Sequence, residues 1–188
     1  MATDDPRGRM VQSATVLLAR AGVAGASFAH VLAHSGAPRG SIYHHFPDGK
    51  DQLVAEAVAL AGARAVAALD HLAGGSPVEV LDGFVGMWRA VLERSSFGVG
   101  CSVLGTVVTD DSAARLDQAD GVFRAWRDRL ARLFADAGLD GDARGVATLV
   151  IASTEGAVVL ARAARDLEPL ETVHAQLRAV VGAARGGS

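Results

Sequence analysis

The sequence predicts an all-α protein of about nine helices, in which a three-helix N-terminal module with a helix-turn-helix precedes a larger helical bundle. Half of the 188 residues are hydrophobic and only five are proline, a composition typical of a folded, helix-rich chain. Apolar side chains recur at three- and four-residue spacing in most segments. Glycine and proline fall mainly between these segments, where helices end and begin.

The charge is unevenly distributed along the chain. The formal net charge is −3, but residues 1–50 carry +2 and the remainder carries −5. This excludes a uniformly basic coat and fits a nucleic-acid-binding module in the first quarter. The single cysteine, Cys101, excludes an internal disulfide and favours a cytoplasmic location.

No segment is expected to target or span a membrane. The polar, acidic start MATDDPRGR differs from the basic and then apolar start of a signal peptide. The most apolar stretch, residues 146–164, contains Glu155 and Arg162. We therefore expect a buried helix there.

Three short helices are expected in the N-terminal module. The first runs from about Pro6 to Ala21, and Gly22 supplies a left-handed cap. Ser27 is a suitable N-cap for the second helix, which ends at Gly36. Pro38 suits the first turn of the third helix, because its missing N–H would be unpaired there.

A long helix leaves this module and five further helices follow. Residues 102–109 have strand propensity, but we predict a helix because a lone strand would have no partner. Glycine- and proline-containing breaks at 74–77, 98–100, 138 and 169 separate the elements. The expected helices cover about 48–72, 77–94, 102–109, 113–137, 142–165 and 168–184.

The stretch VLAHSGAPRGSIYHHF, residues 31–46, resembles the helix-turn-helix of TetR-family transcriptional regulators. That family shows a small residue and glycine, a short turn, a Ser/Thr-aliphatic-Tyr-x-(Tyr/His)-Phe ending, and then lysine and leucine. Gly49 lengthens the gap before the lysine by one residue relative to the usual pattern. The matching positions are Ser35, Gly36, Ser41, Ile42, Tyr43, His45, Phe46, Lys50 and Leu53.

The form HHFPDGK resembles the LmrA/YxaF-like branch of that family, together with Gly100-Cys101 and the later run from Glu155 to Pro169. The resemblance implies a DNA-binding domain at 1–50 and a ligand-binding and dimerisation domain at 51–188. It also implies a repressor that binds a palindromic operator as a dimer and is released by a small, mostly apolar effector. The alternative is a helical small-molecule-binding protein or enzyme that has kept the fold without regulating DNA.

The residues of the motif have the chemistry that DNA contacts require. Arg39 can donate two hydrogen bonds to guanine in the major groove. Helix N-termini favour phosphate through their backbone N–H groups, and Gly40 would let the backbone approach closely. The ring of Tyr43 has an alternative place between the helices, with only its hydroxyl exposed. The expected DNA contacts are Ser27, Pro38, Arg39, Gly40, Ser41, Tyr43, His44 and Lys50.

Aromatic and apolar residues of the later helices suit a ligand cavity with a few polar points. Their spacing is equally that of an ordinary bundle core, and residue patterns alone favour the core. The family resemblance implies an effector pocket instead. The candidate lining residues are Phe84, Trp88, Cys101, Leu104, Val107, Phe123, Trp126, Arg127 and Glu155.

No catalytic or metal-binding constellation is evident, so we predict no enzyme activity, no cofactor and no metal. His30 and His34 are four residues apart, but no cysteine or well-spaced carboxylate completes a site. Cys101 lacks a resolving partner and neighbouring bases in sequence, which favours a buried structural thiol over a redox sensor.

The last two helices carry small and aliphatic residues along one side. A single chain can bury such a stripe against its own bundle, whereas the family resemblance implies a two-fold homodimer interface. One recognition helix makes few contacts, so two half-sites also suit the affinity of DNA binding. The stripe comprises Val146, Leu149, Val150, Ser153, Ala157, Leu160, Val173, Leu177, Val180 and Val181.

Overall fold

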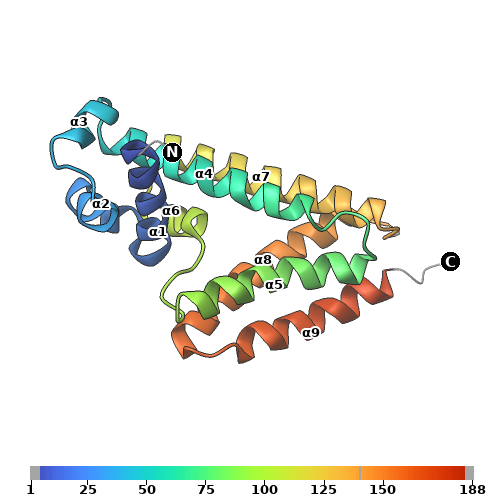
Figure 1. Ribbon diagram of the computed structural model, residues 1–188. Helices are drawn as coiled ribbons and strands as arrows, with labels where there is room; N and C mark the ends of the chain where they lie inside the picture. Colours follow the sequence, from blue (N-terminus) through green and yellow to red (C-terminus); the bar gives the residue numbers. More distant parts are fainter. Residues whose placement is uncertain (1–4, 140, 185–188) are drawn as a thin grey trace. The chain divides into compact units, whose positions relative to one another are not determined.

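The computed structural model describes residues 5–139 and 141–184, and over these residues it contains nine α-helices and no strand (Figure 1). The predicted all-α fold is confirmed, and the ambiguous segment at 102–109 is helical. The helices are α1 (Pro6–Gly25), α2 (Phe28–Ser35), α3 (Ser41–His45), α4 (Lys50–Asp70), α5 (Pro77–Arg94), α6 (Ser102–Thr109), α7 (Ala113–Asp136), α8 (Ala143–Ala164) and α9 (Glu168–Ala183).

The described residues fall into two compact units. The first unit runs to Arg64 and also includes Cys101–Val122, and the second comprises Ala65–Gly100 and the residues from Phe123 onward. The first unit therefore holds α6 and the first part of α7 in addition to the helix-turn-helix. The domain boundary after residue 50 is a functional division and stays a prediction.

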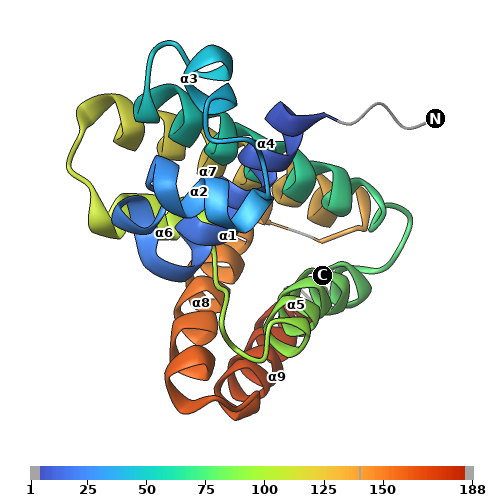
Figure 2. The same ribbon diagram turned by 60° about the vertical axis from the view of Figure 1, so that its left-hand side comes forward.

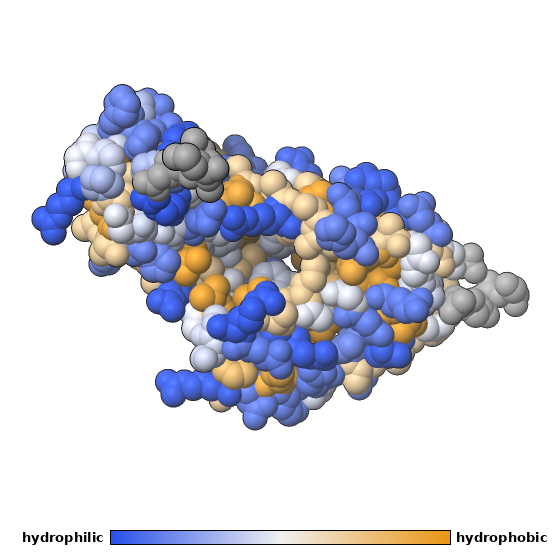
Figure 3. Space-filling view, viewed as in Figure 1, coloured by the Kyte–Doolittle hydropathy of each residue, from blue (hydrophilic) through white to orange (hydrophobic). Residues whose placement is uncertain are grey.

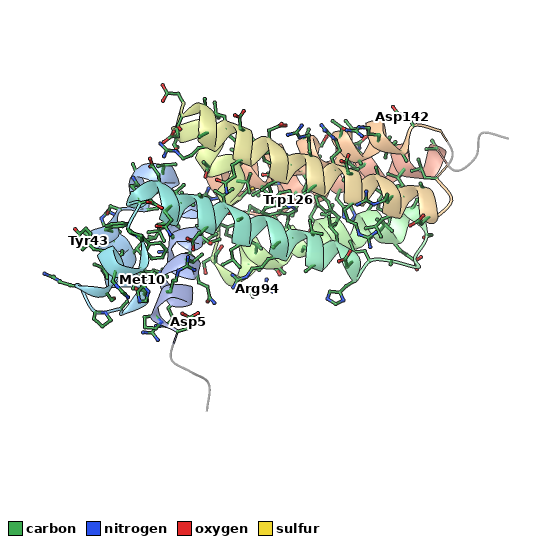
Figure 4. All side chains as sticks on the ribbon, turned by 90° about the horizontal axis from the view of Figure 1, so that it is seen from above. Asp5, Met10, Tyr43, Arg94, Trp126 and Asp142 are labelled. Carbon is green, nitrogen blue, oxygen red and sulfur yellow. The ribbon has the colours of Figure 1, made fainter. Side chains whose placement is uncertain are left out.

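The first unit is organised around α1, which packs against α2, α3 and α6. Figure 4 shows Met10, whose side chain is fully buried, within this unit. The core joins apolar residues of the first four helices, so the helix-turn-helix rests on α1 and α4. Its buried members are Met10, Val11, Ala14, Leu18, Val23, Ala26, Val31, Ala37, Ile42, Phe46, Leu53, Val54, Ala57 and Val58.

A kink interrupts α1 at Gly22. The φ of Gly22 is 63°, as a glycine cap requires, but its ψ of −163° is extended and not left-handed helical. The chain then makes one more turn to Gly25, so α1 is longer than predicted. The backbone N–H of Val23 donates to Thr109 Oγ1 at 3.0 Å, which fastens the kink to the end of α6.

The second unit brings α5, α8 and α9 side by side (Figure 2). α5 begins with a capping box, in which Ser76 and Glu79 each accept a backbone N–H of the other. Arg89 of α5 donates two hydrogen bonds of 2.8 Å to Glu171 of α9. This bidentate pair joins the surfaces of α5 and α9.

Two helices, α4 and α8, are long and apolar enough to cross a membrane by length and composition. Core helices of soluble proteins meet the same criterion, so this is weak evidence for a membrane protein. In α8, eight residues are buried, among them Thr154 and Glu155.

Candidate nucleic-acid interface

The first half of the interface is a well-capped helix. Ser27 Oγ accepts the backbone N–H of His30 at 3.3 Å, as expected for the N-cap of α2. Gly36 closes α2 in the left-handed conformation, with φ of 67°, and its N–H donates to the Leu32 carbonyl at 3.1 Å. These two caps fix where the chain turns toward α3.

The second half begins later than predicted. We expected Pro38 in the first turn of the third helix, and this is wrong, because α3 begins at Ser41. The Pro38 carbonyl accepts both the N–H and the Oγ hydroxyl of Ser41, at 3.0 and 2.7 Å. The backbone bond closes a four-residue β-turn from Pro38 to Ser41, so Pro38, Arg39 and Gly40 precede the helix.

Polar side chains cover the outer surface around α3. Arg39, Gly40 and His44 are exposed, and Ser41 is half-buried. Tyr43 is 69% exposed, so its ring is not buried between helices; it meets the Phe28 ring in a T-shaped contact, with centroids 5.5 Å apart. Figure 4 shows Tyr43 on the outside of the first unit, and Figure 3 shows hydrophilic residues over the same end. Over the described residues of the first unit, the exposed side chains of this surface are therefore available for contacts with DNA.

The start of α4 completes the interface. Lys50 is the first residue of α4 and is half-buried. Behind it, the guanidinium of Arg7 lies 5.5 Å from the centroid of the buried Phe46 ring and binds Glu56 at 2.6 Å. Arg7 therefore links α1, α3 and α4, a role that no local sequence pattern indicated.

The histidines of α2 make separate contacts. His30 Nδ1 lies 3.0 Å from the Gly25 carbonyl, and His34 Nδ1 lies 3.0 Å from Ser13 Oγ. Over the described residues, no group of three or more His, Cys, Asp or Glu side chains is placed to hold a metal ion.

The nine predicted pocket residues are divided between the units. Phe84, Trp88, Phe123, Trp126, Arg127 and Glu155 lie in the second unit, and Cys101, Leu104 and Val107 lie in the first. Within the second unit the rings of Phe123 and Trp126 meet edge to face, with centroids 5.4 Å apart. Glu155 is 7% exposed, and the neighbouring Thr154 is fully buried. The second unit therefore combines aromatic and buried polar groups, and the assignment of the nine to one pocket stays a prediction.

Cys101 has a structural contact. Its side chain is buried, and its Sγ accepts the backbone N–H of Leu104 at 3.3 Å. This thiol caps the N-terminus of α6, which agrees with the structural role favoured by the sequence.

Comparisons with known proteins define the class, which is that of bacterial helix-turn-helix transcriptional regulators. Residues 11–57 match the model of the tetR family of bacterial regulatory proteins. Residues 77–176 match the C-terminal domain of LmrA/YxaF-like transcriptional regulators. The HTH-type transcriptional regulator Rv0196 of Mycobacterium tuberculosis is 40% identical over 181 residues, which cover 92% of each chain. YxaF of Bacillus subtilis is 26% identical and covers 94% of this chain and 95% of its own.

Solved structures of regulators have the same fold. A TetR regulatory protein from Rhodobacter sphaeroides superposes with a TM-score of 0.83 at 22% identity, covering 92% of this chain and 97% of its own. A TetR regulator from Chloroflexus aurantiacus gives 0.78 at 28% identity, covering 94% of each. The chain belongs to the TetR family of transcriptional regulators, and its C-terminal part is of the LmrA/YxaF-like type.

Proposed function

We propose that the protein is a cytoplasmic, ligand-responsive repressor that binds a palindromic operator as a homodimer and has no enzymatic activity. The observation that carries this proposal is the exposed polar surface of Arg39, Tyr43 and His44 on a helix-turn-helix whose caps and core are intact. Family membership favours it over the alternative of a ligand-binding helical protein without DNA regulation.

The DNA contacts divide into two kinds. Arg39 contacts guanine in the major groove. The other contacts lie along the DNA backbone and orient the protein on the duplex. They are Ser27, Pro38, Gly40, Ser41, Tyr43, His44 and Lys50. Arg39→Ala should therefore cost about 1–3 kcal/mol at one base pair and relax specificity there. Lys50→Ala should weaken binding to every operator variant alike.

Fluorescence anisotropy with DNA flanking the protein's own gene tests this division. Arg132→Ala, which removes an exposed arginine of α7, is the matched control for charge. The DNA assignment fails if wild-type protein forms no salt-sensitive, sequence-specific complex. The division of roles fails if Arg39→Ala and Lys50→Ala weaken all operator variants equally.

Dimerisation through α8 and α9 is supported by the apolar side chains that a single chain leaves exposed. On α8, Leu149, Val159 and Leu160 are 44%, 49% and 58% exposed, and Val180 of α9 is 42% exposed. Leu160→Asp should convert the dimer to a monomer in sedimentation. Val108→Asp, at a 68% exposed apolar residue of α6, should leave it dimeric. The interface is refuted if both variants remain dimers.

The effector shifts the equilibrium between the DNA-bound and the DNA-free states of the protein. α4 is continuous from Lys50 to Asp70 and passes from the first unit into the second after Arg64. A ligand among the aromatic residues of the second unit would shift α4, spread the two DNA-binding surfaces and release the operator. Such a ligand must bind the DNA-free state more tightly than the DNA-bound state. Effectors that bind without changing operator affinity would refute this switch.

A further inference from the structure

A polar corner of the first unit joins the start of α7 to the start of α4. Arg115 donates to Asp51 Oδ1 of α4 at 2.7 Å and to Asp110 Oδ2, between α6 and α7, also at 2.7 Å. The arginine side chain is 20% exposed and that of Asp110 is 12% exposed. Because both carboxylates bind one rigid guanidinium, Arg115 joins two segments 59 residues apart in sequence, although Asp51 is 81% exposed.

The positive charge of Lys50 acts on Asp110 in this cluster. The hydrogen bond from Arg115 holds the pKa of Asp110 below its ordinary value, with further lowering by the Ser112 N–H and the positive charge of Lys50. The hydrogen bond to Asp110 in turn raises the pKa of Arg115. Lys50 and Asp51 are the first two residues of α4, so whatever holds Asp51 also holds the backbone of Lys50.

A second bond repeats the connection one turn further along both helices. Gln118 Nε2 donates to the Ala55 carbonyl at 2.6 Å. Gln118 follows Arg115 by three residues and Ala55 follows Asp51 by four, so each pair shares one helix face. The two contacts together fix both the position and the rotation of the first turns of α4.

We propose that Arg115 is a positioning residue for operator binding, which holds the first turn of α4 so that Lys50 meets a DNA phosphate. The proposal rests on the proposed DNA-binding function. Arg115 itself touches no DNA in this arrangement and acts only through Asp51. Arg115 lies outside the helix-turn-helix motif, whose matching positions run from Ser35 to Leu53.

The chain contains a matched control. Arg129, also on α7, donates through Nε to Asp70 of α4 at 2.6 Å, within the second unit. Its side chain is 22% exposed, against 20% for Arg115. Both arginines therefore join α7 to an aspartate of α4, but only Arg115 does so beside the predicted phosphate contact.

Operator affinity of the full-length variants, measured by anisotropy across salt concentrations, tests the proposal. Arg115→Ala should weaken binding about fivefold and reduce the slope of log K against log salt by about 0.9, the value of one phosphate contact. Arg129→Ala removes the same charge and should stay within about twofold of wild type. The double variant Lys50→Ala/Arg115→Ala should lose no more slope than Lys50→Ala alone. Additive loss of slope would overturn the proposal, since Arg115 would then contact DNA itself.

Removal of the Asp51 carboxylate distinguishes a positioning role from a simple effect of charge, because the two predict opposite changes in operator affinity. Removing a carboxylate near DNA normally strengthens binding, and Asp48→Ala should do so or have no effect. Asp51→Ala should instead weaken binding, because Arg115 loses its hold on α4. Stronger binding by Asp51→Ala would overturn the proposal.

Thermal unfolding and titration of the DNA-binding-competent fraction check that each variant is folded. If Arg115→Ala does not fold, Arg115→Lys serves in its place; it keeps the charge but loses the two-carboxylate bridge, and it should show the same loss of slope. Failure of wild-type protein to bind any operator refutes the proposed function. Wild-type binding with unchanged Arg115 variants refutes only the positioning role.

Discussion

The contact of α1 with α6 in the first unit and that of α5 with α9 in the second are made by different means. In the first unit, backbones approach closely: a Cβ on Gly105 of α6 would lie 2.5 Å from the Leu18 carbonyl oxygen of α1. In the second unit, α5 and α9 are joined at their surface by side chains, with Arg89 binding Glu171, and Asp82 binding both His174 and Arg178. Long side chains can adjust to a small displacement, whereas a backbone contact cannot. The α1–α6 contact should therefore be less tolerant of substitution than the α5–α9 contact.

The largest expected difference in the free energy of unfolding is between alanine substitutions at two helical glycines. Gly105→Ala should destabilise the protein by about 2–3 kcal/mol, because the new methyl group meets backbone that cannot move aside. Gly86→Ala, in the middle of α5, has no atom within 4 Å of the new Cβ. It should stabilise by about 0.5–1 kcal/mol through the higher helix propensity of alanine. Urea unfolding of both variants measures the difference, and effects of equal sign would contradict it.

A smaller difference is expected between two threonines. Thr109 Oγ1 accepts the Val23 N–H and donates to the Gly105 carbonyl at 2.6 Å. Thr109→Val keeps the shape but leaves the Val23 N–H unpaired, which should cost about 1–3 kcal/mol. Thr148 of α8 is exposed and binds only the Arg144 carbonyl of its own helix. Thr148→Val should be nearly neutral in the same unfolding assay. Equal losses of stability would show that the hydrogen bond from Val23 to Thr109 does not stabilise the protein.

The sequence predicted the elements well because their ends are determined locally. Ser27, Gly36, Ser76 and Gly138 mark helix ends through cap and turn chemistry that depends on a few neighbouring residues. The error at Pro38 is also local: proline tolerates a helix start, but the Ser41 hydroxyl and N–H both bond to its carbonyl and close a turn instead.

The composition of the two units was not predictable in the same way. α6 belongs with α1 because Gly105 and Thr109 fit against Leu18 and Gly22, which lie 83 or more positions earlier in the sequence. Arg115 looked like one charge among many on the polar face of a long helix. Only the fold brings Asp51 and Asp110 to it. The contacts of the helix-turn-helix were indicated by a local motif, whereas the residues that hold it in place were not.

Two N-cap serines separate stability from DNA binding. Ser27 caps α2 with one hydrogen bond, and Ser76 caps α5 within a reciprocal capping box. Each alanine variant should lose about 1 kcal/mol of stability. Only Ser27→Ala should also weaken operator binding, because Ser27 is a predicted phosphate contact. Thermal unfolding and anisotropy on the same samples test this; an equal loss of operator affinity in Ser76→Ala would show that stability alone explains the effect.

The smallest expected effect is a dependence of stability on pH that arises in the first unit. The pKa of Asp110 lies below its ordinary value of 3.8, chiefly because of the Arg115 hydrogen bond. A lowered folded-state pKa contributes stability that is present above the unfolded value and is lost as the pH falls through the folded value. In the second unit, the hydrogen bond to Glu171 raises the pKa of Arg89 above its ordinary value, so Arg89 keeps its charge at acidic pH.

Asp110→Asn should therefore destabilise the protein near neutral pH, and the difference from wild type should shrink as the pH falls from about 7 to about 3. Urea midpoints across this range measure the difference. Thr148→Val in the second unit is the control: neither side chain titrates in this range, so its effect should not change with pH. If the deficit of Asp110→Asn is the same at both ends of the range, the ion pair with Arg115 contributes no pH-dependent stability. The corner would then hold α4 by hydrogen-bond geometry alone.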